Sequence, residues 1–176
     1  AGTFNASPAA SLPVFTRITG DGVINPGSKT VTLAAGGILG PGNSPGDLEI
    51  QGSLSVANIL DTGGLQFELG SPTDTVLVTT GGVLNIGTLN FADFTFSQIT
   101  GFGSGVYTLF DTTNTVTGNI GTASGSLGGS YVGTLSLANS GQDVVLTVVV
   151  PEPGTFGLIA LGAVGLLTGR RRRHSN

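Results

Sequence analysis

Apolar and polar residues alternate with a period of two along most of the chain between Thr30 and Val150. The runs are short, rich in Val, Ile, Leu, Thr and Phe, and separated by Gly, Asn, Asp and Ser. This pattern predicts β-strands joined by turns, and no part of the region has the stripe of an amphipathic helix. The predicted strands are Thr30 to Leu33, Leu48 to Gln51, Ser53 to Ala57, Leu65 to Leu69, Thr75 to Thr79, Val83 to Ile86, Leu89 to Phe91, Val106 to Phe110, Tyr131 to Leu137 and Asp143 to Val150.

Two glycines followed by aliphatic residues recur in this region. The three copies are Gly36-Gly37-Ile38-Leu39, Gly63-Gly64-Leu65, with Gln66 in the last position, and Gly81-Gly82-Val83-Leu84. Their spacings of 27 and 18 residues are multiples of nine, which suits a solenoid with coils of roughly 18 to 20 residues. Stacked coils of this kind bury their apolar faces against one another. An antiparallel β-sandwich with glycine-rich hairpins is the alternative that these loose repeats leave open.

The body of the chain also resembles a known family of repeats. The turn cluster Pro41 to Gly46 starts its better-patterned half. The segments that carry the resemblance are Leu39 to Gly52, Phe67 to Gly70, Asp74 to Val78, Gly105 to Phe110 and Val144 to Val150. They resemble the β-helical repeats of autotransporter passenger domains. The resemblance covers about residues 36–150 and implies a right-handed parallel β-helix, used as a stalk, adhesin or display scaffold. We expect the all-β solenoid body to span residues 30–150. Residues 1–29 are then expected to be part of a truncated upstream β region.

Composition and charge exclude several classes of function. Only 9% of the residues are charged and 31 of the 176 are Gly, a profile far from that of a helical cytosolic enzyme. Four of the six basic residues are Arg170 to Arg173, so two basic residues against ten acids give the chain before Arg170 a formal charge of −8. Nucleic acid is therefore not expected as a partner, because a basic face for phosphates is missing. With no Cys, and with His174 in the tail as the single His, the body lacks the residues of a Ser-His-Asp triad or a zinc site.

Residues 151–176 differ from the rest of the chain. Pro151-Glu152-Pro153 ends the last predicted strand and stays extended, because Pro has no ladder donor and restricts the residue before it. Gly154 to Gly169 follows without a charge, about 24 Å long as a helix against a hydrocarbon core of about 30 Å. The arginines after it cannot enter lipid and stay on the cytoplasmic side. We predict one short transmembrane α-helix, anchored by Phe156, Leu158, Ile159, Leu161, Val164, Leu166 and Leu167, with Arg170, Arg171, Arg172 and Arg173 as the stop-transfer signal.

The order of Pro-Glu-Pro, short apolar helix, arginine cluster and chain end resembles the PEP-CTERM sorting signal of Gram-negative bacteria. The resemblance covers Val150 to Asn176. It implies that Pro151, Glu152 and Pro153 are recognised by an exosortase, a membrane-embedded enzyme that cuts near this motif. The inner membrane is then a transient partner, and the body ends at the cell surface or outside it, in bacteria that make exopolysaccharide and biofilm. A permanent tail anchor is the plainer alternative.

Carboxylates are the candidates for a competing, enzymatic function. Asp47 and Glu49 share one face of a predicted strand and could act as acid and base if the next coil brought them near Glu68 or Asp74. β-Helices host polysaccharide lyases and hydrolases, so a carbohydrate-active enzyme is the alternative function. Acids at turns and edges are, however, common in any acidic solenoid.

A calcium-binding site is the second alternative for these turns and acids. The calcium-binding nonapeptide has Gly-Gly-x-Gly-x-Asp, and its fourth position is Leu39, Gln66 or Leu84 here, so the pattern fails. We therefore expect at most weak binding of Ca²⁺, by Asp61, Asp74 or Asp111 in turns.

We therefore expect an exported structural or adhesive protein of the cell surface or extracellular matrix. Its expected partners are an exosortase, the inner membrane and exopolysaccharide. We expect no cofactor and no enzymatic activity.

Overall fold

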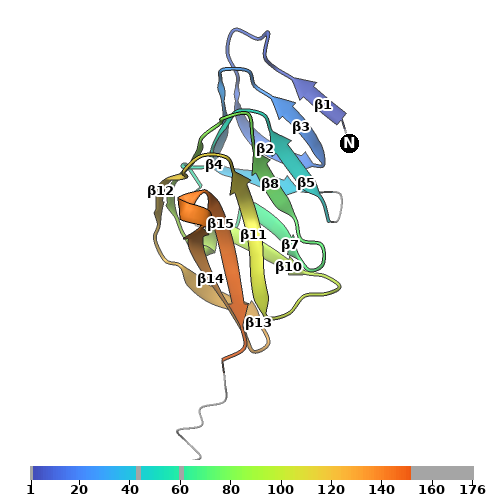
Figure 1. Ribbon diagram of the computed structural model, residues 1–176, viewed down its shortest axis with the longest axis vertical. Helices are drawn as coiled ribbons and strands as arrows, with labels where there is room; N and C mark the ends of the chain where they lie inside the picture. The colour runs from blue at the N-terminus through green and yellow to red at the C-terminus, as the bar shows by residue number, and fades with distance from the viewer. Residues whose placement is uncertain (1, 43–44, 60–61, 152–176) are drawn as a thin grey trace, which may run out of the picture.

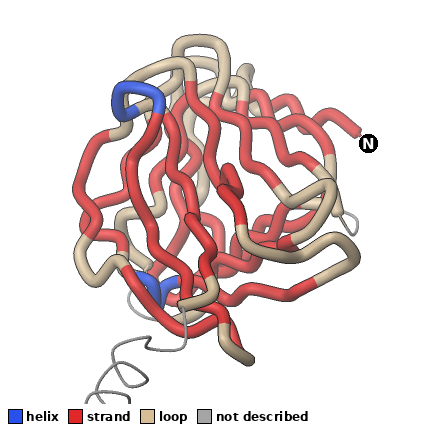
Figure 2. Tube along the Cα trace, turned by 60° about the horizontal axis from the view of Figure 1, so that its bottom comes forward, coloured by secondary structure: helices blue, strands red, loops and turns tan. Residues whose placement is uncertain are grey.

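The computed structural model describes residues 2–42, 45–59 and 62–151 of the chain, and these residues form an almost purely β structure (Figures 1 and 2). Their only helical elements are two 3-10 turns, η1 (Phe91–Asp93) and η2 (Asn139–Gly141). The prediction of an all-β body is therefore confirmed.

The strands form two curled sheets. The first has the order β1 (Gly2–Asn5), β3 (Gly22–Asn25), β5 (Asp47–Ile50), β8 (Thr75–Val78), β11 (Gly105–Thr112), β15 (Asp143–Val149), β14 (Tyr131–Ala138), β13 (Ser124–Gly128). The second has the order β10 (Phe94–Gln98), β7 (Leu65–Leu69), β4 (Thr30–Pro41), β6 (Ser53–Ser55), β9 (Leu84–Leu89), β12 (Thr117–Ile120), and β2 (Val14–Gly20) also pairs with β4.

Parallel pairing dominates both sheets. All pairs of the second sheet are parallel, and so are those of the first sheet from β1 to β11. In the first sheet Gly2 pairs with Gly22, Gly22 with Leu48, Leu48 with Val76 and Val76 with Phe110. These steps are 20, 26, 28 and 34 residues, so all but the first exceed the predicted coil length. Each longer step includes strands of the second sheet and the turns that lead to them.

Antiparallel pairing closes the C-terminal end of the first sheet. β11 pairs with β15, β15 with β14 and β14 with β13 in antiparallel fashion, so the expectation of parallel strands up to Val150 is wrong for this end. The reason lies in the connections. Only Gly129 and Ser130 separate β13 from β14, and η2 with Gln142 separates β14 from β15. Such short loops join antiparallel neighbours, whereas parallel strands need a long crossover. Positive φ angles at Gly128 (91°) and Gly129 (57°) make the first of these turns possible.

Single predicted strands also differ from the observed ones. Leu89 to Phe91 is not a strand of its own, because Leu89 ends β9 and Phe91 begins η1. The side chain of Asp93 accepts a hydrogen bond from the Asn90 backbone N–H (2.6 Å), which favours the 3-10 turn over continued extension. The strands that the alternation did not predict are β1, β2, β3, β10, β12 and β13. Of these, β2 and β3 pair with β4 and β5, so residues before Thr30 contribute to the same two sheets.

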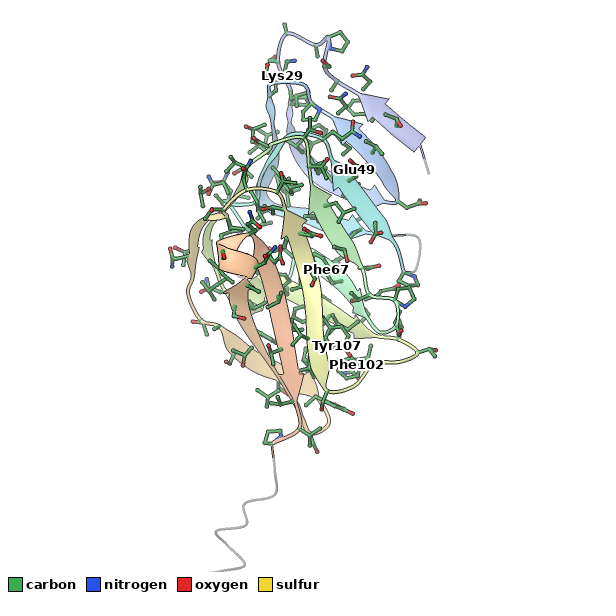
Figure 3. The ribbon with its side chains drawn as sticks, viewed as in Figure 1. Lys29, Glu49, Phe67, Phe102 and Tyr107 are labelled. Atoms are coloured by element: carbon green, nitrogen blue, oxygen red, sulfur yellow. The ribbon has the colours of Figure 1, made fainter. Side chains whose placement is uncertain are left out.

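The core lies between the two sheets and follows from the period-two pattern. In β7 the buried and outward positions alternate, and β8 has the same pattern. Phe67 on β7 is 1% exposed and packs against the rings of Phe94 (5.9 Å between centroids) and Phe110 (5.5 Å). Figure 3 shows Phe67 in the interior of the body. The other large side chains with almost no exposure are Leu33, Leu39, Ile50, Leu54, Leu65, Leu69, Leu84, Ile86, Leu89 and Leu109.

The repeated glycine pairs lie where one strand or turn stacks closely on the next. A Cβ atom on Gly64 would lie 2.2 Å from the carbonyl oxygen of Gly37, so the first two copies of the repeat do stack on each other. The third copy does not continue this stack. A Cβ on Gly82 would instead lie 2.0 Å from the carbonyl oxygen of Gly52, a residue outside the repeat.

Replacing Gly82 with Ala is expected to lower the free energy of unfolding by about 1–3 kcal/mol, because the methyl group meets backbone atoms that cannot move without separating the two segments. Gly105 is the matched control. A Cβ there meets nothing within 4 Å, and Gly105→Ala should stay within about 0.5 kcal/mol of the parent protein. Urea unfolding curves measure both values, and equal stabilities of the two variants would contradict the stacking.

Candidate functional site

The predicted sorting segment begins at the end of β15, and β15 is held firmly in the first sheet. It lies between β14 and β11 and is hydrogen-bonded to both. Its inward side chains Val144, Leu146 and Val148 are almost fully buried. The last pairs along it join Val148 to Gly105 and Val149 to Val132. The strand therefore remains paired up to the residue at which it ends.

The chain emerges from the body immediately after this strand. Val149 is 47% and Val150 44% exposed, and Pro151 is exposed as well. Because Pro151 has no N–H, it cannot extend the ladder. The body ends at the bottom of Figure 1, at the end opposite to β1. We call this end, where the chain leaves the body, the exit end.

The remaining predicted site residues lie outside the described part of the chain. These are Glu152 and Pro153 of the motif, the apolar run 154–169 and the arginines 170–173. Within the part that the structure describes, no helix is both long and apolar enough to span a bilayer.

Comparison with protein families gives this segment its identity. Residues 149–173 match the PEP-CTERM protein-sorting motif. The PEP-CTERM motif indicates an exported protein that is sorted at the membrane and processed by an exosortase, as the resemblance implied. The comparisons with curated proteins and with solved structures found no match, so the likeness of the body to autotransporter repeats stays a prediction.

The carboxylates of the alternative, enzymatic hypothesis line two different hollows. Asp47 and Glu49 on β5 line one of about 450 Å³, together with Asp21. Glu68 and Asp74 line another of about 320 Å³. The structure thus brings together the two members of each pair but assigns the pairs to separate hollows. Sequence reasoning missed Asp21, which belongs to the segment before the first predicted strand.

Hydrogen bonds already occupy two of these carboxylates. Asp74 is 2% exposed, and its two oxygens accept hydrogen bonds from the backbone N–H groups of Gly46 (2.8 Å) and Glu68 (2.9 Å). Burial raises the pKa of Asp74 above its ordinary value, and the charges of Glu68 and Asp47 raise it further, while the two backbone hydrogen bonds oppose this. Glu49 accepts hydrogen bonds from the side chains of Thr79 (2.8 Å) and Gln51 (3.2 Å). Asp74 therefore fastens the turn before β5 to β7.

The acids considered for calcium do not form a cluster in the described residues. Asp61 lies outside them, Asp74 binds backbone N–H groups, and Asp111 lies on β11. Among residues 2–42, 45–59 and 62–151 there is no group of three or more His, Cys, Asp or Glu that could hold a metal ion.

Asp143, at the start of β15, has a raised pKa. Burial of its carboxyl group is the main cause and the nearby charge of Asp111 is the second, while hydrogen bonds from Asn139 and Thr112 oppose them. For an acid whose folded-state pKa lies above the unfolded value of 3.8, the stabilising contribution is present below that value. It is lost as the pH rises through the raised pKa.

Replacing Asp111 with Asn should therefore lower the pKa of Asp143 and reduce the stability lost between acidic and neutral pH. NMR titration of the Asp143 carboxyl carbon measures the pKa, and denaturation at several pH values measures the stability. Asp21→Asn, which removes an exposed acid elsewhere, is the control that should leave this titration unchanged. An unaltered Asp143 titration in the Asp111 variant would show that this charge does not act on it.

Proposed function

We propose that this chain is a structural or adhesive protein of the cell surface or extracellular matrix, and not an enzyme. The observation that supports it most is the position of the PEP-CTERM motif. The match begins at Val149, the last residue of β15, so the folded body ends where the sorting segment starts. Of the residues in this sequence, those that remain after sorting then lie in the β body.

The chemistry of the segment accounts for the sorting. The uncharged run 154–169 enters the bilayer as a short helix, and Arg170 to Arg173 remain on the cytoplasmic side. Pro151, Glu152 and Pro153 are then held at the outer face of the inner membrane as the motif that the exosortase recognises. Anchoring raises the local concentration of this peptide beside the enzyme. Because β15 is paired with β11 up to Val148 and with β14 up to Val149, the cleavable joint has a rigid attachment.

The body suits the role of a scaffold. Its largely parallel strands bury apolar side chains inward, and we propose that they form a solenoid of the autotransporter type. Its outward positions include many Thr, Ser, Asn and Gln side chains, which are hydrogen-bonding partners for polysaccharide hydroxyl groups. We propose exopolysaccharide as the ligand, biofilm as the setting and a Gram-negative bacterium as the host.

A carbohydrate-active enzyme is less well supported. Asp74 is occupied by two backbone N–H groups, and Asp47 with Glu49 lines a different hollow from Glu68. Incubating the full chain with acidic and neutral polysaccharides tests this alternative directly. We expect no cleavage. Cleavage that disappears in Asp47→Asn or Glu49→Gln would make the enzyme the better account.

The surface location is tested in intact cells of the source organism. Added protease should digest the mature body while a cytoplasmic marker protein stays intact, and the body should also be found in the outer-envelope or matrix fraction. A body that is protected until the cells are broken would contradict the proposal.

A further inference from the structure

The exit end of the body carries exposed apolar side chains. Val106 is 66% exposed, Val149 47% and Val150 44%. Val106 pairs with Thr147, and Thr147 and Val149 are two residues apart on β15, so Val106 and Val149 lie on the same outer face of the first sheet. Both lie where β11 begins and β15 ends, beside the point at which the chain leaves the body.

Aromatic rings lie at the same end of the body, on the inward side of the first sheet, where they pack against the core. Phe102, in the loop before β11, stacks on Tyr107 (6.0 Å between centroids) and meets Tyr131 edge to face (4.9 Å). The Tyr107 hydroxyl donates to the Gly103 carbonyl oxygen (2.8 Å) and accepts from the Gly103 N–H (2.9 Å), which ties the loop down. Phe102 and Tyr131 pack against the core and are only partly buried, so each keeps part of its surface exposed. Figure 3 shows Phe102 and Tyr107 towards the exit end.

Charge is nearly absent from this part of the chain. From Phe94 to Gln142 the single charged residue is Asp111. It lies near the end of β11, whereas Val106 lies near its start, so it is far along the strand from the exit end. The exposed acids Asp21 and Asp47 belong to strands and turns nearer to β1.

The distance to the apolar run is short. Only residues 151–153 separate Val150 from Gly154, and three residues span at most about 10 Å. A body tethered this closely must bring its exit end to the bilayer surface when the run is inserted. Charged surface would have to be kept hydrated there, but the exposed side chains Val106, Val149 and Val150 are apolar. The loop before β11 and the turn between β13 and β14 expose only uncharged Gly, Ser and Thr residues around them. Aromatic side chains favour the interface between lipid and water.

We propose that the exit end of the body rests in the interfacial layer of the phospholipid bilayer while the sorting segment is inserted. This inference rests on the proposed membrane insertion of residues 154–169. The contact orients the body and holds Pro151 at the membrane surface. Because the exposed side chains Val106, Val149 and Val150 are uncharged, their contact with the bilayer needs no anionic lipid.

Site-specific fluorescence tests this contact, because the chain has no Cys and each introduced Cys is its sole thiol. The full chain is reconstituted into phosphatidylcholine vesicles, and a nitrobenzoxadiazole label is attached in turn to Val106→Cys, Val149→Cys, Phe4→Cys and Leu161→Cys. Phosphatidylcholine that is spin-labelled near its headgroup or deep in its acyl chains serves as the quencher. Phe4, 55% exposed on β1, is the matched apolar position at the opposite end of the body.

We expect headgroup-level quencher to remove most of the emission from the labels at positions 106 and 149 and little from position 4. The label at position 161 should be quenched by the deep quencher. A quenched label at position 161 with unquenched labels at 106 and 149 overturns the interfacial contact and leaves membrane insertion standing. A label at position 161 that no lipid quencher reaches overturns the insertion itself, and the contact with it.

Discussion

Replacing Phe67 with Ala is expected to lower the free energy of unfolding by about 3–5 kcal/mol. Phe67 is 1% exposed, and its ring contacts those of Phe94 and Phe110, one from each sheet. Truncation removes the transfer free energy of the ring and leaves a cavity in the core between the two sheets, and the backbone hydrogen bonds within each sheet fix the positions of its strands. The parallel stack therefore has little freedom to close the cavity.

Urea unfolding followed by circular dichroism measures this loss. Phe4→Ala removes an equally large side chain that is 55% exposed, and it should change the stability by no more than about 0.5 kcal/mol. Phe67→Leu, which keeps most of the volume, should cost less than the Ala variant and covers the case in which Phe67→Ala does not fold. Equal effects of the variants at positions 4 and 67 would contradict the proposed core.

Replacing Glu152 with Gln is expected to block maturation almost completely, so that full-length protein accumulates in the inner membrane. Glu152 is the acidic centre of the PEP-CTERM motif, and Gln keeps its shape while removing its charge. Fractionation of the source cells followed by immunoblotting measures the ratio of full-length to processed chain.

Asp21→Asn is the matched control for this loss, because it removes one carboxylate from an exposed turn between β2 and β3. It should mature as the parent protein does. Normal processing of the Glu152 variant would show that the charge at this position is not recognised.

Local pattern was enough to locate most strands between residues 30 and 150, because their alternation reflects one buried and one outward face. β7 and β8 coincide with predicted runs apart from one terminal residue. Two of the missed strands have no such pattern. β12 (Thr-Gly-Asn-Ile) and β13 (Ser-Gly-Ser-Leu-Gly) have few apolar residues, and their strand conformation depends on pairing with β9 and β14. Tertiary pairing of this kind cannot be seen in a single short segment.

Stacking register was predictable only in part. The glycine repeat correctly predicted that Gly37 and Gly64 lie close together, because neither position has room for a side chain. The partner of Gly82 is Gly52, and nothing in the phrase Gly81-Gly82-Val83-Leu84 indicates this. The pair Gly128-Gly129 can be seen in the sequence, and such a pair favours a hairpin between antiparallel strands. The expectation that all strands were parallel led to this signal being overlooked.

The two kinds of candidate site also differ in how far sequence could locate them. The PEP-CTERM motif is linear, since its proline joint, apolar run and arginines follow one another, so order along the chain was sufficient. The carboxylate hollows are assembled across strands. Asp21 lies 26 residues before Asp47, and only the pairing of β3 with β5 places them on the same hollow.

The C-terminal mass of the mature protein tests the central claim most directly. Body purified from the surface or matrix fraction of the source organism is analysed by intact-mass spectrometry and by sequencing of its C-terminal peptide. The account predicts that the chain ends near Pro151 to Pro153, with the apolar run and the arginines of residues 154–173 removed. A mature surface protein that still ends at Asn176 would contradict it and would leave a permanent anchor as the explanation.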